Sequence, residues 1–158
     1  MSHTIMLLLS IMIGVVCGLR SLTAPAVVAW AAHRSWINLD HTPLHFMGSS
    51  VAVAVFTLFA VVELVADQLP SAPRRTDPPG LIARIVLGAL CGAALAVSGE
   101  QSMAIGAAWG AAGGVAGAFG GYEVRTRLVK ALKVPDFVIA TLEDAVAIGA
   151  GLFLVSRF

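Results

Sequence analysis

The stretch from Ile5 to Ala32, IMLLLSIMIGVVCGLRSLTAPAVVAWAA, decides how the rest of the chain is interpreted. It is longer than the roughly 20 residues that cross the hydrocarbon core of a membrane as a helix, and it carries Arg20 near its middle. Pro25 cannot donate a hydrogen bond to the carbonyl of Ser21, so the sequence predicts a kink or a short unwound section beside Arg20. We therefore expect a membrane helix that is interrupted at a charged residue.

The whole chain has the composition of an integral membrane protein. Of its 158 residues, 58% are hydrophobic and 12% are charged, whereas an average soluble domain has roughly 25% charged residues. The formal net charge is +1, without a basic or acidic tail, so no nucleic-acid partner is predicted. The expected partner is the lipid bilayer, and no cofactor is predicted.

Five apolar stretches predict an all-α bundle of membrane-spanning helices in a single transmembrane domain that covers residues 1–158. Each stretch approaches or exceeds the length of a helix that spans the hydrocarbon core. Prolines separate the second stretch from the third, and Pro135 precedes the fifth. The predicted spans are Ile5 to Ala32, Ser50 to Leu69, Leu81 to Ser98, Met103 to Tyr122 and Phe137 to Ser156.

The basic residues predict the orientation of these spans. A cytoplasmic N-terminus and five crossings place most arginines and lysines on the inner side and leave only Arg34 and Arg157 outside. This follows the positive-inside rule, so we expect a bacterial inner-membrane protein with its N-terminus in the cytoplasm. A re-entrant first segment would give an even number of crossings and change the side of the C-terminus. The inner basic residues are Arg74, Arg75, Arg84, Arg125, Arg127, Lys130 and Lys133.

Glycines recur at a spacing of four residues in the third and fourth stretches. This spacing lets helix backbones approach closely and gain dispersion contacts in lipid. We interpret the rows as packing faces within the bundle, with a homo-oligomer seam on one row of the fourth stretch as the alternative. The predicted packing glycines are Gly14, Gly18, Gly88, Gly92, the row Gly106, Gly110 and Gly114, and the row Gly113, Gly117 and Gly121.

Two acidic segments lie inside apolar stretches, the first from Glu63 to Asp67 and the second at Glu143 and Asp144. Charged groups within a spanning helix are costly and usually face a partner or a water-filled cavity. At a rise of ~1.5 Å per residue, Glu63 and Glu143 both lie ~9 Å inside the cytoplasmic boundary. We therefore predict one polar site in the cytoplasmic half, formed by Glu63, Asp67, Glu143 and Asp144 with Arg20 nearby.

Competing interpretations of this site remain open. In one, the carboxylates bind a cation or exchange protons, and the protein is a small channel or carrier for an ion or small solute. In another, Arg20 or Arg84 pairs with a carboxylate, and the protein is a membrane scaffold or assembly factor whose charges only hold the helices together. An enzyme acting on lipid could use paired acids, but the sequence offers no histidine or evident metal set at that depth. We therefore predict no enzyme.

Two weaker patterns complete the candidates. His41 and His45 are spaced like two metal ligands on one helical face, but Pro43 between them argues against a regular helix, so no metal site is predicted. A faint internal echo pairs the segment 18–21 with the segment 122–126, each ahead of an acidic segment on oppositely directed helices. Inverted repeats of this kind occur in transporters.

A family resemblance rests on three segments: Gly18-Leu-Arg-Ser-Leu-Thr-Ala-Pro25, Val62-Glu-Leu-Val-Ala-Asp67-Gln-Leu-Pro70 and Thr141-Leu-Glu-Asp144-Ala-Val. Together they resemble a family of small bacterial membrane proteins catalogued as domain of unknown function 4126. The resemblance covers most of the chain, and the Glu-x-x-x-Asp-x-x-Pro and Glu-Asp elements are its most specific parts. Where other members have an Asn-like polar residue after the first glycine motif, this chain has Arg20. The resemblance implies a multi-span inner-membrane protein and supplies no activity.

Overall fold

A computed structural model of the chain describes residues 2–67 and 76–158, and within these residues every regular element is helical. The prediction of an all-α bundle is therefore confirmed. By length and composition α4, α5 and α6 are able to cross a membrane, whereas α1 and α3 are shorter apolar helices. The elements are α1 (His3–Leu19), α2 (Thr23–His33), the 3-10 turn η1 (His45–Gly48), α3 (Ser50–Ala66), α4 (Pro78–Ser98), α5 (Met103–Leu132) and α6 (Asp136–Val155).

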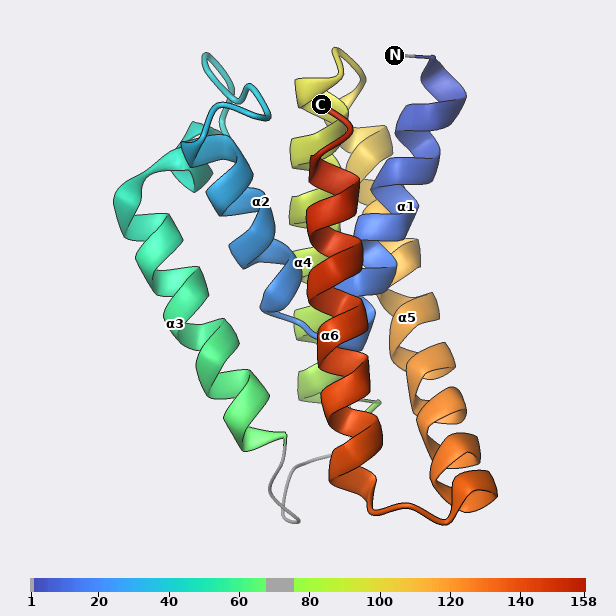
Figure 1. Cartoon of the computed structure of the whole chain (residues 1–158). Coiled ribbons are helices and arrows are strands. Elements are labelled where there is room, and N and C mark those ends of the chain that lie inside the picture. The colour runs from blue at the N-terminus through green and yellow to red at the C-terminus, as the bar shows by residue number, and fades with distance from the viewer. Residues whose placement is uncertain (1, 68–75) are drawn as a thin grey trace.

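The first apolar stretch is broken, as predicted, but the chain also reverses its direction at the break. In Figure 1, α1 runs away from the N-terminus into the bundle, and α2 returns to the same end. Two hydrogen bonds hold the beginning of α1 and the loop after α2 beside the α4–α5 turn. Nδ1 of His3 lies 2.6 Å from Oε1 of Gln101, and the backbone N–H of Asn38 donates to Oγ of Ser98 at 3.0 Å. Residues 3–33 therefore form a helical hairpin, whose tip is the segment 20–22.

The hairpin changes the predicted topology. After it, α3, α4, α5 and α6 run in alternating directions, and the two termini lie at the same end of the bundle (Figure 1). The stretch from Ile5 to Ala32 returns to the end of the bundle at which it begins, which agrees with the alternative of a re-entrant first segment. The predicted end of the second span at Leu69, and the predicted inner residues Arg74 and Arg75, lie outside the described residues.

The internal echo is only partly reflected in the fold. The helices that carry the acidic segments, α3 and α6, do run in opposite directions (Figure 1). However, the segment 18–21 forms the end of α1 and the hairpin tip, whereas the segment 122–126 is continuous helix within α5. The two segments therefore have different local structures.

Glycines bring α1, α4 and α5 into backbone contact. A Cβ added at Gly88 would lie 2.7 Å from the carbonyl oxygen of Gly110, and one at Gly18 would lie 2.6 Å from Cα of Gly117. The row from Gly106 to Gly114 therefore packs mainly on α4, and the row that contains Gly117 packs on α1. Such close approach gives dispersion contacts that offset the missing hydrophobic drive in lipid. An added Cβ would also overlap with a neighbouring helix at Gly14, Gly92, Gly106, Gly110, Gly113 or Gly114.

Both predicted glycine rows of α5 are thus occupied within the chain. Within the described residues these rows face α1 and α4 and not a free surface, and Gly121 is buried and lines a groove described below. A third line of small residues along α5 is exposed, namely Ala108, Ala112, Ala116 and Gly120.

Candidate functional site

The centre of the polar site is Arg20, at the tip of the hairpin. Its side chain is completely buried, although the residue itself is extended and ends α1. Nη1 of Arg20 donates to the carboxylate of Asp67 at the end of α3, and Nε lies 2.5 Å from Oδ1 of Asp144 on α6. One guanidinium is therefore shared by two carboxylates that come from two different helices.

Glu63 of α3 caps the beginning of α2. Its Oε1 accepts hydrogen bonds from the backbone N–H and the hydroxyl of Ser21, at 2.9 and 2.5 Å, and its Oε2 accepts from the N–H of Leu22 at 2.8 Å. Leu22 at the N-cap position has no side chain that could do this. The first N–H groups of a helix lack partners within it and carry the positive end of its dipole. The carboxylate of Glu63 therefore stabilises this buried helix end.

Arg84 of α4 contacts the C-terminal end of α1, which precedes the break. Its Nε donates to the carbonyl oxygen of Gly18 at 3.1 Å, its Nη1 donates to that of Gly80 at 3.0 Å, and its Nη2 lies 3.8 Å from Oε1 of Glu63. A cation is favourable at the C-terminal end of a helix. Each helix end at the tip thus meets a side chain of the opposite charge, Arg84 for α1 and Glu63 for α2. These contacts satisfy backbone groups that lipid could not satisfy.

Glu143 does not join these residues. Its Oε2 lies 3.5 Å from Nη1 of Arg125, and Arg125 also binds Asp136. Because Asp144 is displaced by about 100° around the helix from Glu143, the two adjacent carboxylates face different neighbours. The predicted site is therefore divided in two. We call Arg20, Glu63, Asp67, Arg84 and Asp144 the tip cluster, and the second site is the Arg125–Glu143 pair.

The Arg125–Glu143 pair borders an apolar groove of about 370 Å³ between α1, α5 and α6. Sequence reasoning missed this role of Arg125, because the predicted fourth span ended at Tyr122 whereas α5 continues to Leu132. The signal was present, since neither glycine nor proline interrupts the segment 123–132. The groove also includes Leu19, Gly117, Gly120, Gly121, Leu128, Ile139 and Val146.

Two buried polar groups at the tip have unused hydrogen-bonding capacity. Among the described residues, Nη2 of Arg20 and Oγ1 of Thr23 have no hydrogen-bond partner, and Thr23, the first residue of α2, is only 3% exposed. The close contact between Nε of Arg20 and Oδ1 of Asp144 is an ion pair without hydrogen-bond alignment. A buried polar group without a partner costs about 1–3 kcal/mol, and such groups are few in native proteins. The tip is therefore an unusual concentration of them.

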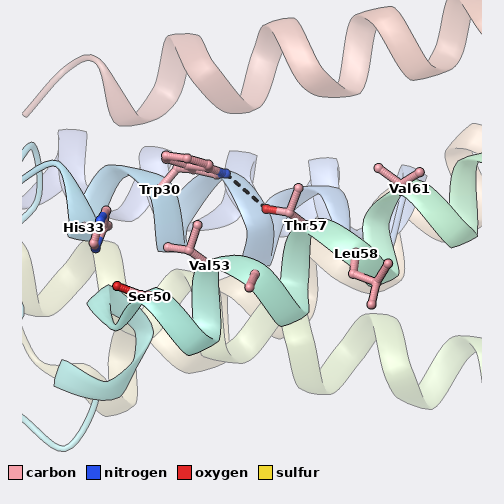
Figure 2. Close-up of a pocket in the computed structure, with 8 residues that line it drawn as sticks. Trp30, His33, Ser50, Val53, Thr57, Leu58 and Val61 are labelled. Carbon is pink, nitrogen blue, oxygen red and sulfur yellow. Dashed lines mark hydrogen bonds between the residues drawn. The ribbon is translucent and has the colours of Figure 1, made fainter.

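A second apolar groove, of about 580 Å³, runs along α2 and α3. Figure 2 shows Trp30 above it, with Nε1 donating to Oγ1 of Thr57 at 3.0 Å, and Val53, Leu58 and Val61 along its α3 side. This hydrogen bond ties the middle of α3 to α2. The inner end of α3 is held instead by the carboxylates of the tip cluster.

His41 and His45 lie in the segment between α2 and α3, apart from the tip cluster in sequence. His45 and Asp40 line a polar pocket of about 320 Å³, while His41 is exposed and has a positive φ. Across residues 2–67 and 76–158, no group of three or more histidine, cysteine or acidic side chains is placed to hold a metal ion.

Comparison with known proteins identifies the family. The family described as "Domain of unknown function (DUF4126)" matches residues 7–156, a range that includes the hairpin, the tip cluster and the Arg125–Glu143 pair. Searches of the curated proteins and of the solved structures found no match. The chain belongs to the DUF4126 family of domains of unknown function.

Proposed function

We propose that this protein is a small membrane carrier or channel in which the tip cluster exchanges a proton or another cation. One observation carries the proposal: the buried guanidinium of Arg20 is shared by Asp67 and Asp144. Within this triad of described residues, one positive and two negative groups leave an excess of one negative charge. A charge without compensation is expensive at membrane depth, so this triad favours a state in which a proton or a cation neutralises the excess.

The other charges of the tip cluster do not remove this excess. Glu63 and Arg84 lie close enough to balance each other, and both are also committed to the helix ends at the break. The side chains of Asp67 and Asp144 retain 24% and 13% of their accessible surface, whereas Arg20 retains none. A proton can therefore reach the aspartates more readily than it can reach the arginine between them.

The hairpin supports the same proposal. Backbone that is not helical occurs at membrane depth only where protein buries it or where it lines a cavity. In secondary transporters, the ends of discontinuous helices near the bilayer midplane form the sites for ions and substrates. The ends of α1 and α2 meet at such a break, between α3, α4 and α6.

The proposal includes a location in the bacterial inner membrane and an orientation of the bundle within it. Arg84, Arg125, Arg127, Lys130 and Lys133 lie toward the end of the bundle opposite the termini, where α4 begins and the α5–α6 turn lies (Figure 1). The positive-inside rule assigns that end to the cytoplasm. Both termini then lie outside, which reverses the side first predicted for the N-terminus, because the hairpin does not cross.

Proteoliposomes test this proposal. Vesicles that contain the pH-sensitive dye pyranine are given an inward pH gradient in potassium chloride, with valinomycin to prevent a diffusion potential. We expect the natural protein to dissipate the gradient. We expect Asp144→Asn and Asp67→Asn to slow the dissipation at least about tenfold, because the loss of a proton-transfer group typically lowers a rate by such factors or more. Glu123→Gln is the matched control, because Glu123 is an exposed acid paired with Arg127 within α5.

A flux that persists in both aspartate variants rules out the tip cluster as the pathway. If either variant folds poorly, Asp144→Glu keeps the charge and alters the reach of the carboxylate, so a changed rate in a folded protein still tests the role of this position. Folded yield is judged by the elution of the detergent-solubilised protein on size exclusion.

A membrane scaffold is the second candidate, and a specific observation favours it. Each of the arginines Arg20, Arg84 and Arg125 contacts at least one carboxylate, as expected if the charges only lock helices together. This candidate predicts that Asp67→Asn and Asp144→Asn lower the unfolding temperature, while vesicles with and without the protein lose a pH gradient equally slowly.

A homo-oligomer also remains part of the proposal. Since α4 and α1 occupy the predicted glycine rows, the exposed line of Ala108, Ala112, Ala116 and Gly120 is the small-residue surface of α5 that another helix can approach.

A further inference from the structure

We propose that the groove between α1, α5 and α6 holds an acyl chain of a membrane phospholipid whose headgroup carries a primary ammonium beside its phosphate, as in phosphatidylethanolamine. The acyl chain lies along α5, and the headgroup meets the charged side chains around Arg125, toward the end of the bundle where α5 and α6 join (Figure 1). This site is separate from the tip cluster. It requires a bilayer around the helices, and it does not depend on transport.

The groove is long and mostly apolar. On α5 its lining extends from Ala116 to Leu128, which is ~18 Å at a rise of ~1.5 Å per residue. The lining combines buried residues, such as Gly117 and Ile139, with exposed ones, such as Val146. The groove is therefore open toward the surrounding hydrocarbon, and its length suits an extended acyl chain better than a compact solute.

Gly120 leaves room within this groove. A Cβ added there would meet no atom within 4 Å, although Gly117, one turn earlier, packs against α1. Helix α6 packs mainly on α1 and α2, and much less on α5. Among the described residues, no side chain thus fills the space beside Gly120. A gap leaves the atoms that line it without dispersion contacts, and an acyl chain restores these contacts.

The groove also passes from the apolar part of α5 into its charged part. This helix has 30 residues and is ~45 Å long, whereas the hydrocarbon core is about 30 Å thick. From Met103 to Tyr122 it carries no charged residue, and a charged segment begins at Glu123. The groove starts before this change and ends after it. A phospholipid has the same order, with an apolar chain followed by a charged headgroup.

The charges at this end of the groove have both signs. Among the described residues, the charged side chains in the lining are Arg125 and Glu143, which lie 3.5 Å apart. Asp136, which also binds Arg125, is exposed. A headgroup with only negative charge would meet two carboxylates as well as the arginine. A phosphate beside Arg125 and an ammonium beside Asp136 or Glu143 match both signs.

The ammonium must also be able to donate hydrogen bonds. A primary ammonium has three donors, as the side chain of lysine does, and it can give them to a carboxylate. The trimethylammonium of phosphatidylcholine has the same charge but no N–H group. We therefore expect the groove to prefer phosphatidylethanolamine both to phosphatidylcholine and to the anionic phosphatidylglycerol.

Thermal unfolding of the purified, delipidated full-length protein in detergent tests this preference. The three lipids, with identical acyl chains, are added at equal mole fractions. A ligand that binds only the folded state raises the unfolding temperature. We expect phosphatidylethanolamine to raise it by at least about 2 °C more than the other two lipids do, a shift that is readily measured for a chain of this size.

Gly120→Leu fills the groove from α5. Its Cβ enters open space, and leucine is the better helix former, so the unfolding temperature without lipid should stay equal or rise while the additional rise with phosphatidylethanolamine is lost. Val146→Phe fills the groove from α6 and serves as a second variant if Gly120→Leu does not fold. Gly149→Leu is the matched control. Gly149 also faces open space but does not line the groove, so this variant keeps the lipid-specific rise.

Glu143→Gln tests the headgroup. The amide leaves the groove lined but removes a negative charge beside the ammonium, so the advantage of phosphatidylethanolamine over phosphatidylcholine should shrink. Glu123→Gln, on the same end of the bundle but outside the lining, should leave this advantage unchanged.

A lipid-specific rise that persists in both groove-filling variants overturns the site. Equal rises with all three lipids, or the largest rise with phosphatidylglycerol, overturn the assignment of the headgroup. Ala116 and Gly120 also belong to the small-residue line proposed for a homo-oligomer. If no lipid has an effect and Gly120→Leu lowers the oligomeric mass on size exclusion, the groove holds a second copy of the chain and the proposal is wrong. These results are independent of the vesicle assay of the tip cluster.

Discussion

At the scale of single residues, Glu63 links the end of α3 to the beginning of α2, the helix before it in the chain. It belongs to α3, but its carboxylate accepts hydrogen bonds from the N–H groups of Ser21 and Leu22, the two residues that directly precede α2. Asp67, one turn further along α3, binds Arg20 instead. Two acids on one helix face thus have separate tasks, because one meets the backbone of the tip and the other meets its only charged side chain.

Replacement of Glu63 by glutamine tests the capping role. The amide keeps one acceptor but loses the charge and one of the oxygens, so we expect the free energy of unfolding to fall by about 1–2 kcal/mol. Chemical unfolding in detergent, followed by tryptophan fluorescence, measures the change. Glu123→Gln should cost less than about 0.5 kcal/mol, since exposed ion pairs contribute little. Equal losses in the two variants would contradict the capping role.

At the scale of elements, the contacts of α5 with α1 and α4 set the framework on which the tip is held. Gly92 faces Gly110 so closely that an added Cβ would lie 2.8 Å from Cα of Gly110. Gly149 on α6 has no atom within 4 Å of such a Cβ. The two glycines are both within helices and differ in what lies opposite them, so they form a matched pair for mutation.

Gly92→Ala should therefore push α4 away from α5 and destabilise the protein by about 1–3 kcal/mol, the usual cost of overpacking. Gly149→Ala should be neutral or stabilising by up to about 1 kcal/mol, because alanine is the better helix former. The unfolding temperatures of the two variants, measured side by side, check this contrast. If both variants lost similar amounts of stability, the α4–α5 contact would not be the reason for a glycine at position 92.

The elements were largely predictable from the apolar stretches, and the reasons for the differences are local. The predicted span from Met103 ended at Tyr122, because charged residues follow, yet α5 continues to Leu132. Long polar side chains at the end of a membrane helix can extend beyond the hydrocarbon core, so charge alone does not mark where a helix stops. The interruption near Arg20 and Pro25 was also predictable, since proline and a buried charge both oppose a continuous helix.

At the scale of the whole molecule, the direction of the chain after the break could not be predicted from local sequence. The residues at the break, such as Arg20 and Pro25, are equally compatible with a helix that only bends and with a chain that turns back. The difference lies in distant partners, because Arg84 and Glu63 satisfy the two helix ends only when α1 and α2 fold back together. For the same reason, Asp144 but not Glu143 joins Arg20, which depends on how α6 is rotated rather than on depth.

The topology gives a prediction at this scale. Single cysteines at Ser2, Lys133 and Ser156, all exposed positions, can be labelled with a membrane-impermeant maleimide in a protein that lacks Cys17 and Cys91. We expect Ser2→Cys and Ser156→Cys to react from the same side and Lys133→Cys from the opposite side. Labelling of the two terminal positions from opposite sides would restore five crossings and exclude the hairpin.

The hairpin also has a consequence for biosynthesis. The ribosome makes Arg20 early, whereas Asp67, Arg84 and Asp144 follow in that order, and the last of them is near the end of the chain. Until α6 enters the membrane, the hairpin carries a charge that lacks one of its two counterions. The N-terminal segment therefore completes its folding only after the C-terminal helix arrives, and a nascent chain cut before α6 exposes an incompletely paired arginine that membrane quality control can recognise.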